Sequence, residues 1–366
     1  MPPDYNPLMQ NDAILPEVPR IISWNLTARC MLKCPHCYIS AGDPQRGELS
    51  TEQAREVIRR IVSFSRPVVI LSGGEPTLRE DIFEIIRFGT GNGLRMVMGS
   101  CGFLVDEATA GDLLRAGLKK IAISLDSCRP EVHDRFRGVE GAWEKAVEAI
   151  RGSVSAGLGV QIHTTVTWDN FREITDIIAF GRELGVTDFQ VFFLVPTGRG
   201  GTLSDVTPEM YETMIREVLT ISASGLNIRP TCAPQFIRIA HDMGLSLEKW
   251  GRGCIAGKSY CRITPTGEVT PCPYLPISCG NILTTPFDEI WYGSRVLRDL
   301  RDTGKLKGKC GRCEYRELCG GCRARAYGLG GHDTHEPGPY SGEEQAHYLD
   351  EEPWCPYVPP AKEGRI

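Results

Sequence analysis

The stretch Cys30-Met31-Leu32-Lys33-Cys34-Pro35-His36-Cys37 places three thiols on one short segment of the chain. Thiols at this spacing are typical ligands of an iron–sulfur cluster or of zinc. Structural zinc needs a fourth ligand, and His36 lies between two of the cysteines, where it is poorly placed to bind the same ion. Three thiolates on a four-iron cluster leave one iron open for a substrate or a cofactor. The spacing therefore predicts an iron–sulfur cluster with a chemical role, with a zinc site and plain buried thiols as the alternatives.

Outward from this stretch, between about residues 20 and 225, short apolar runs alternate with helix-like segments. The runs predict strands at Ile21–Leu26, Pro67–Leu71, Arg95–Met98, Ile121–Leu125, Val160–Val166 and Phe189–Leu194. Helices are expected from Ser50, which forms a capping-box pattern with Gln53, and near residues 79–88, 106–116, 142–156, 170–184 and 208–222. Six strand–helix units predict an α/β fold with a parallel sheet, arranged as an open partial (β/α)6 barrel.

Polar segments follow three of the predicted strands. The Cys30–Cys37 loop follows the first strand, Ser72-Gly73-Gly74-Glu75-Pro76 follows the second, and Ser124-Leu125-Asp126 closes the fourth. The carboxyl ends of parallel strands meet at one edge of a sheet, and ligands bind there. The three segments are therefore predicted to form one site.

The last third of the chain has a different composition. Residues 250–360 are dense in Gly, Pro and Cys and have little apolar periodicity, so metal rather than an apolar core is expected to stabilise them. A hairpin is predicted from Tyr260–Ile263 and Glu268–Thr270 around Thr266-Gly267, and a helix from Pro286–Arg301. The predicted organisation is an N-terminal extension (1–19), the barrel (20–225), a linker (226–249), a cysteine-rich cluster domain (250–360) and a tail (361–366).

Composition excludes some classes of partner. The chain has 366 residues, with 41 basic against 46 acidic, and no block of Lys or Arg, so no nucleic-acid partner is expected. No apolar run approaches the length of a membrane span, and the polar, Pro-rich residues 1–20 lack the features of a signal peptide. We therefore expect a cytoplasmic protein without a membrane partner. In that reducing compartment, most of the 15 cysteines are expected on metals rather than in disulfides.

The cysteine spacing, its place after the first strand and the glycine-rich turn after the second resemble the radical S-adenosylmethionine (SAM) superfamily. The resemblance implies a 4Fe–4S cluster on Cys30, Cys34 and Cys37 whose open iron binds SAM. It also implies reductive cleavage of SAM to a 5′-deoxyadenosyl radical that abstracts hydrogen from a substrate. The SAM-binding residues that it implies are His36, Gly73, Gly74, Glu75, Pro76, Ser124 and Arg137. For Arg137 a surface salt bridge is the alternative, and for His36 simple exposure to solvent.

A second resemblance covers the cysteine-rich region. Cys254-x6-Cys261-x5-Gly267-x4-Cys272, then Cys310-x2-Cys313-x5-Cys319-x2-Cys322, then Cys355, is similar to the SPASM extension. That extension holds one or two auxiliary iron–sulfur clusters. Carried over residue by residue, it implies one cluster on Cys254, Cys261, Cys272 and Cys322, and another on Cys310, Cys313, Cys319 and Cys355. Paired zinc sites are the alternative.

Four cysteines fall outside both patterns. Cys101 and Cys128 are expected to be buried, inert thiols, and Cys279 has no place in the pattern although it lies close to the cluster region in sequence. Cys232 lies between the two predicted domains. It is the candidate thiol facing the substrate.

Three stretches, Phe192–Gly200, Pro230–Pro234 and Cys319–Tyr327, resemble the haem-biosynthesis branch of the SPASM group. That branch makes haem by the alternative, SAM-dependent pathway, or the haem of nitrite reductase. The resemblance implies an iron tetrapyrrole substrate, oxidative decarboxylation of its propionates to vinyl groups, and an auxiliary cluster that takes the remaining electron. Arg199, Arg229 and Arg238 are candidate partners of the propionates, because guanidinium and carboxylate groups match in geometry.

The alternative substrate is a peptide, in a maturase or cross-linking enzyme. The short N-terminal extension leaves no room for a fused peptide-recognition domain, although a separate partner remains compatible with it. For either substrate, a ferredoxin or flavodoxin-type protein is the expected reductant.

Overall fold

The computed structural model describes residues 18–203, 206–248, 251–329 and 347–360, and these contain one curved sheet of ten strands. Its order is β10-β9-β8-β1-β2-β3-β4-β5-β6-β7, and the strands from β8 to β7 in that order are parallel. The first seven are β1 Ile21–Asn25, β2 Val68–Ser72, β3 Arg95–Ser100, β4 Lys120–Ser124, β5 Gly159–Val166, β6 Asp188–Phe193 and β7 Asn227–Thr231. The predicted α/β fold with a parallel sheet is confirmed.

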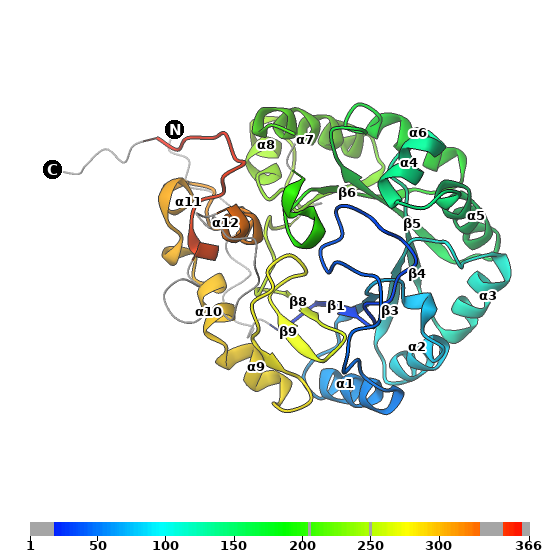
Figure 1. Cartoon of the computed structure of the whole chain (residues 1–366). Coiled ribbons are helices and arrows are strands. Elements are labelled where there is room, and N and C mark those ends of the chain that lie inside the picture. The colour runs from blue at the N-terminus through cyan, green and yellow to red at the C-terminus, as the bar shows by residue number, and fades with distance from the viewer. Residues whose placement is uncertain (1–17, 204–205, 249–250, 330–346, 361–366) are drawn as a thin grey trace.

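Helices cover the outer face of this sheet (Figure 1). They are α1 Thr51–Phe64, α2 Ile82–Gly91, α3 Glu107–Ala116, α5 Ala142–Ser155, α6 Ile174–Glu183, α7 Pro208–Ala223 and α8 Phe236–Asp242. The short helix α4 Pro130–Arg137 and the 3-10 turns η2 Pro76–Leu78 and η3 Gly198–Thr202 lie instead in the connections after β4, β2 and β6. The predicted capping box of α1 is present, since Ser50 and Gln53 bond reciprocally. None of the described helices is long and apolar enough to cross a membrane.

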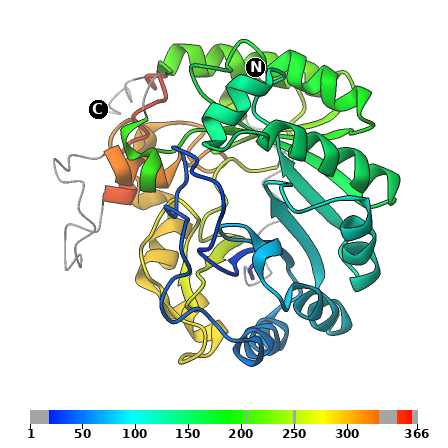
Figure 2. The ribbon, with the colours of Figure 1, turned by 45° about the vertical axis from the view of Figure 1, so that its right-hand side comes forward.

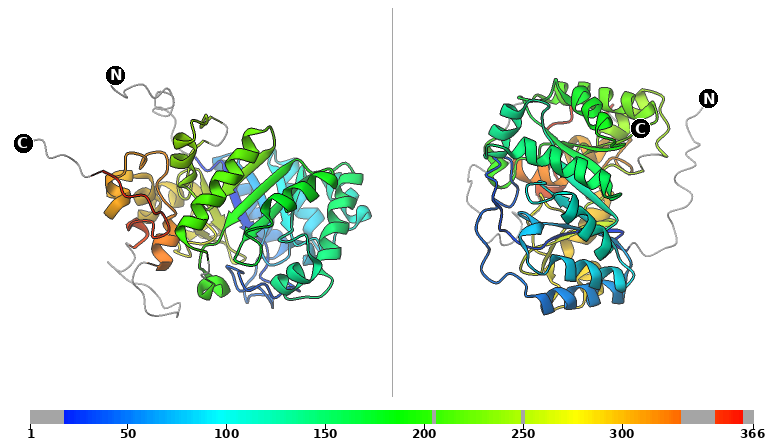
Figure 3. Two further views of the ribbon diagram at one scale, coloured as in Figure 1. Left: turned by 90° about the horizontal axis from the view of Figure 1, so that it is seen from above. Right: turned by 90° about the vertical axis from the view of Figure 1, so that its right-hand side faces the viewer.

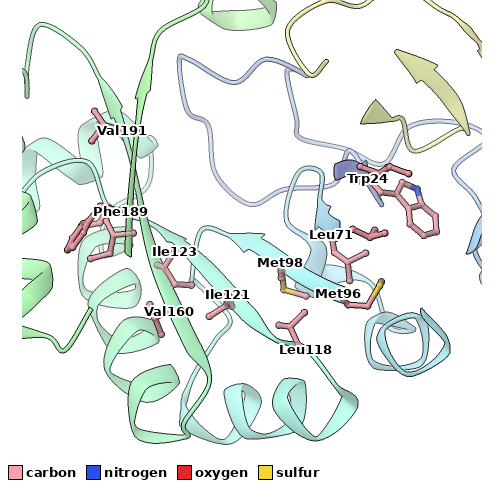
Figure 4. Packing of buried hydrophobic residues seen from close by; sticks show 14 of the residues in the cluster. Trp24, Leu71, Met96, Met98, Leu118, Ile121, Ile123, Val160, Phe189 and Val191 are labelled. Carbon is pink, nitrogen blue, oxygen red and sulfur yellow. The ribbon is translucent and has the colours of Figure 1, made fainter. Parts of the chain in front are cut away.

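The hydrophobic core lies between the sheet and these helices. Along β5 the side chains alternate, with Val160 and Ile162 buried and the residues between them partly exposed. Gly181 of α6 approaches this layer so closely that a Cβ there would lie 2.6 Å from both Ile162 and Phe189. The row of Ile123, Ile162 and Phe189 therefore faces the helices. Figure 4 shows Ile123 and Phe189 in this layer. The residues between these along each strand face the inside of the curved sheet.

A seventh parallel strand, β7, lies where the sequence predicts a linker. It pairs with β6, and Pro230 within it is tolerated because β7 is the edge of the sheet, where one side of the backbone needs no partner. The barrel wall therefore reaches residue 231. The short helix α4 is a second element that the periodicity did not predict, and it begins with Pro130 in its first turn.

The cysteine-rich region extends the same sheet. The predicted hairpin is confirmed as β8 Tyr260–Ile263 and β9 Glu268–Thr270, and β8 pairs in parallel with β1. The predicted helix Pro286–Arg301 is two helices, α9 Phe287–Gly293 and α10 Arg295–Arg301, because the backbone is extended at Ser294.

The remaining elements are β10 Gly280–Asn281, η4 Thr303–Lys305, α11 Gly308–Arg312 and α12 Arg323–Leu329. Figure 3 shows these segments, coloured yellow to red, gathered at one side of the barrel. Most of the predicted N-terminal extension (1–17) and all of the predicted tail (361–366) lie outside the described residues.

Candidate functional site

The three thiols of residues 30–37 lie on the loop that follows β1, and each sulfur receives a hydrogen-bond donor. The Leu32 N–H points at Cys30 Sγ over 3.4 Å, and the Ala41 N–H at Cys37 Sγ over 3.3 Å. The Arg137 guanidinium lies 3.8 Å from Cys34 Sγ. Donors aimed at sulfur stabilise thiolates, which are the form that binds iron. The residues present therefore fit the 4Fe–4S cluster that the sequence predicts.

The thiols also lie close enough to affect one another. Burial raises the pKa of Cys30 to about 11, and the charges of Glu75, Cys34 and Cys37 raise it further against the Leu32 amide. Burial likewise raises the pKa of Cys34, although Arg137 opposes it. Cys30 and Cys34 therefore hold their protons more tightly than free thiols do. Metal binding here is therefore expected to release protons.

The glycine-rich turn after β2 packs against the backbone that leads into the cysteine loop. The Gly74 N–H donates to Thr27 O over 2.7 Å, and the Glu75 N–H donates to Arg29 O over 2.8 Å. A Cβ on Gly74 would lie 2.2 Å from Arg29 O, and one on Gly73 would lie 2.4 Å from Thr27 O. Both glycines, which are predicted to bind SAM, therefore also let the turn approach the backbone that leads into Cys30.

Glu75 is fully buried, and its carboxylate is occupied by neighbours. It accepts hydrogen bonds from the Thr77 hydroxyl (2.7 Å), the Ser100 hydroxyl (2.9 Å) and the Cys101 N–H (2.8 Å). These contacts join the turn to the end of β3. Glu75 remains one of the residues predicted to bind SAM.

Arg137 is buried, and the surface salt bridge considered as its alternative is not what the structure shows. Its Nε donates to Asp126 Oδ2 over 2.7 Å, and its Nη2 pairs with the same oxygen. Burial would raise the pKa of Asp126, but the charges of Arg137, His133 and His36 hold it below its usual value. Asp126 follows Ser124 by two residues, at the carboxyl end of β4, where the sequence predicts a site. Its pairing with Arg137 could not be read from the sequence.

His36 is partly exposed, and it makes a specific contact that simple exposure to solvent would not give. Its ring stacks on Phe136 at 4.3 Å between centroids, and Nδ1 is buried without a hydrogen-bond partner in the described part of the chain. Burial, with help from Arg137, lowers its pKa to about 3, so the ring is neutral at ordinary pH. A neutral ring with a vacant nitrogen fits an aromatic ligand such as an adenine.

The loop after β6 holds the cysteine loop from the other side. Arg199 donates to Cys34 O over 2.9 Å and to Ala41 O over 2.7 Å. Gly198 approaches so closely that a Cβ there would lie 2.5 Å from Tyr38 O. Figure 2 shows η3 beside the dark blue loop. The Arg199 guanidinium, a predicted substrate contact, is therefore committed to the cysteine loop.

The inner face of the sheet carries a polar row that starts at Ser124. Across the strands, Ser124 lies opposite His163, His163 opposite Gln190, and Gln190 opposite Arg229. Arg229 is partly buried and has no hydrogen-bond or ion-pair partner among the described residues. Burial alone lowers its pKa. Arg238, by contrast, is buried between Glu212 and Asp242.

The four cysteines predicted for the second auxiliary cluster come together. Cys310, Cys313, Cys319 and Cys355 all line one cavity, which Gln235, Lys309, Glu352 and Tyr357 also line. The Glu352 N–H donates to Cys310 Sγ over 3.3 Å. Burial and the charges of Cys355, Cys310 and Cys313 raise the pKa of Cys319, which shows that the four thiols face one another.

The set predicted for the first auxiliary cluster comes together only in part. Cys272 packs against the buried group that contains Cys322, and the charges of Cys254 and Cys322 add to burial in raising its pKa. Cys261 is fully buried on β8 and is close to Cys279 instead. Cys232 is a further thiol beside this group, because the charges of Cys322, Cys272 and Cys254 all help to raise its pKa.

Cys101 and Cys128, which the sequence predicts to be buried, are only partly buried. Burial, together with Glu75, raises the pKa of Cys101 far above its usual value. Burial raises that of Cys128 to about 11. Among the described His, Cys, Asp and Glu residues, no three gather tightly enough to hold a single metal ion, which is the arrangement that structural zinc needs.

Comparison with known families agrees with this geometry. A model of the radical SAM superfamily matches residues 24–181, and one of the SPASM iron–sulfur cluster-binding domain matches residues 254–323. An AdoMet-dependent heme synthase of Methanosarcina barkeri is 41% identical, over 94% of this chain and 98% of that protein. A pre-heme d1 synthase of Dinoroseobacter shibae is 33% identical, over 85% of this chain and 83% of that protein.

Among solved structures, SuiB of Streptococcus suis bound to S-adenosylmethionine superposes with a TM-score of 0.72. The superposition covers 93% of our chain and 78% of the SuiB chain, with 16% sequence identity. The likeness therefore shows a shared fold alone.

Proposed function

Because the chain belongs to the radical SAM superfamily, in the SPASM branch that contains the AdoMet-dependent haem synthases, we propose that it acts on an iron tetrapyrrole in haem biosynthesis. The proposed reaction is oxidative decarboxylation of propionate side chains to vinyl groups. It takes place in the cytoplasm, with electrons from a ferredoxin or flavodoxin-type protein. The supporting observation is the extent of the similarity to the haem synthase, which includes the barrel wall and the cysteine-rich region and not the SAM-binding part alone.

Arg229 gives a physical reason to expect a substrate with carboxylates. Of the three arginines considered as propionate partners, Arg199 binds carbonyls of the cysteine loop and Arg238 is paired with two carboxylates. Arg229 is partly buried on the inner face with no partner among the described residues, and a desolvated guanidinium gains most from a bidentate carboxylate. It lies three strand spacings from Ser124, or roughly 14 Å along the row.

The proposed reaction converts one propionate side chain at a time. With one electron from the cluster that Cys30, Cys34 and Cys37 would hold, SAM would be cleaved to methionine and a 5′-deoxyadenosyl radical. That radical would remove one hydrogen atom from the substrate. When this hydrogen atom comes from the propionate carbon next to the ring, a radical remains on that carbon. The bond between the second carbon and the carboxylate then breaks, which gives a vinyl group, carbon dioxide and one electron. Each vinyl group therefore needs one electron acceptor, a role that auxiliary iron–sulfur clusters suit.

The direct test is an anaerobic incubation of the reconstituted enzyme with SAM, dithionite and iron-coproporphyrin, followed by mass spectrometry. We expect the porphyrin to lose carbon dioxide and two hydrogen atoms for each converted side chain, with one 5′-deoxyadenosine formed each time. Replacing Cys30, Cys34 and Cys37 by Ala should abolish both products. An enzyme that cleaves SAM but leaves the mass of the porphyrin unchanged would contradict the proposal and favour a peptide substrate.

A second experiment tests Arg229. We expect Arg229→Gln to weaken binding of iron-coproporphyrin about tenfold, because one charged hydrogen-bonding partner is lost. SAM cleavage in the absence of porphyrin should be unchanged. Arg182→Gln, on the exposed outer side of α6, is the matched control and should bind porphyrin normally. Equal affinities of the two variants would remove Arg229 from the substrate site.

A further inference from the structure

Cys232 has a backbone conformation that cysteine rarely adopts. It directly follows β7, and its φ is +59°, in the left-handed region that favours glycine. The Arg325 guanidinium holds this conformation, since Nη2 donates to Cys232 O over 2.9 Å and to Leu194 O over the same distance. A strained residue that its surroundings hold in place is often part of a site.

Three other thiols surround Cys232. It packs with Cys272 against the buried group that contains Cys322. The segment with Cys254 also lies near Cys232. Gly253, the residue before Cys254, packs against Pro234, and a Cβ on Gly253 would lie 3.0 Å from the Pro234 side chain. Burial raises the pKa of Cys232 well above its usual value, and the charges of all three thiols raise it further.

Cys261 points away from this group. Successive side chains of a strand face opposite sides of the sheet. Arg262, the residue after it, faces inward, because its guanidinium lies over the Tyr38 ring of the cysteine loop. Cys261 therefore faces the outer core, and it lies near Cys279 and Arg301. Its partner on β1 is Ile22, which is likewise fully buried in that core.

We propose that Cys232, and not Cys261, is the fourth thiolate beside Cys254, Cys272 and Cys322 in the first auxiliary iron–sulfur cluster. Cys232 lies outside the segment that matches the SPASM domain, at the end of the last parallel strand of the barrel. The cluster then has ligands from both parts of the chain. The proposal concerns cluster ligation alone and holds whichever substrate the enzyme uses.

The test counts iron in the full-length chain with Cys30, Cys34 and Cys37 replaced by Ala, so that only auxiliary clusters remain. This background should hold roughly eight irons for two four-iron clusters. Into it we introduce Cys232→Gly, which removes the thiol and suits the positive φ, or Cys261→Ala. We expect Cys232→Gly to lose one to four irons and to change the electron paramagnetic resonance spectrum of the reduced protein, and Cys261→Ala to leave both unchanged.

Cys232→Ser separates ligation from folding. A serine oxygen replaces the sulfur as a ligand, so iron should be largely retained while the resonance signal of one cluster shifts. An unchanged spectrum in both Cys232 variants would overturn the proposal. Loss of iron in Cys261→Ala would overturn it as well, whether or not Cys232→Gly also loses iron.

Discussion

At the scale of single residues, Arg137 shows how one side chain serves both stability and the site. Its guanidinium pairs with buried Asp126 and also faces Cys34 Sγ at 3.8 Å. Burying a carboxylate is costly unless a partner compensates its charge. The same positive charge favours the thiolate form of Cys34. A change at Arg137 should therefore affect the fold and the cluster together.

The first prediction concerns this buried pair. Arg137→Gln leaves Asp126 uncompensated and should lower the free energy of unfolding by about 3–5 kcal/mol. Adding Asp126→Asn should restore part of the loss, because a neutral amide needs no counter-charge. Urea unfolding followed by circular dichroism of the metal-free protein measures both. Arg135→Gln is the control on the same helix, since its pair with Asp169 is exposed and should contribute little.

At the scale of elements, three segments hold the cysteine loop. The glycine-rich turn after β2 bonds to the backbone before Cys30, and α4 bonds to the loop through Lys33 N and Arg137 O at 3.0 Å. The segment with Arg199 binds carbonyls inside the loop. A loop of this length would otherwise sample many conformations. Its three thiols are thereby ordered before any cluster arrives.

The second prediction tests the turn. Gly74→Ala places a Cβ 2.2 Å from Arg29 O, so the backbone before Cys30 must move. We expect this variant to bind less iron at the first cluster and to form little 5′-deoxyadenosine. Gly42→Ala is the matched control, because Gly42 bonds to the same loop but has open space around its Cα. If both variants cleave SAM equally well, the close approach at Gly74 is not important for the cluster.

Part of this could be predicted from the sequence, and the missing part has physical causes. The strand–helix alternation and the hairpin at Tyr260–Thr270 are local patterns, and both appear in the structure. β7 was missed because Pro230 interrupts its pattern, which only an edge position permits. Cys261 matches the spacing of cluster ligands, but spacing does not show which face of a strand a side chain occupies. The proximity of Cys232 to the later cysteines arises from tertiary packing alone.

At the scale of the whole molecule, Arg325 connects the barrel to the C-terminal segment. It donates to Leu194 O and Cys232 O of the barrel and to Glu352 Oε1 over 3.1 Å, and it stacks over Trp354. Glu352 in turn accepts from the Cys322 N–H over 2.7 Å. The pair is almost fully buried, so its charges are little screened. The geometry of both auxiliary sites depends on it.

The third prediction is that Arg325→Gln destabilises the holoenzyme by about 3–5 kcal/mol, because Glu352 loses its buried counter-charge. Auxiliary iron should fall while the cluster at residues 30–37 remains. Anaerobic urea unfolding and iron counting give the two readouts. Arg298→Gln, on the exposed side of α10, is the control. Full iron content and an unchanged unfolding midpoint in Arg325→Gln would contradict this account.

The parallel pairing of β1 with β8 also has a consequence for the order of events during synthesis. Arg262 of β8 donates to Asn25 of β1 over 2.6 Å, although the two are 237 residues apart. A nascent chain that has completed β1 to β7 still exposes one edge of β1 at the ribosome, and free edges invite pairing with other chains. Closure by so distant a strand is slow. The edge of β1 therefore stays unpaired until residue 263 has been synthesised, and unwanted strand pairing at this edge is confined to that interval.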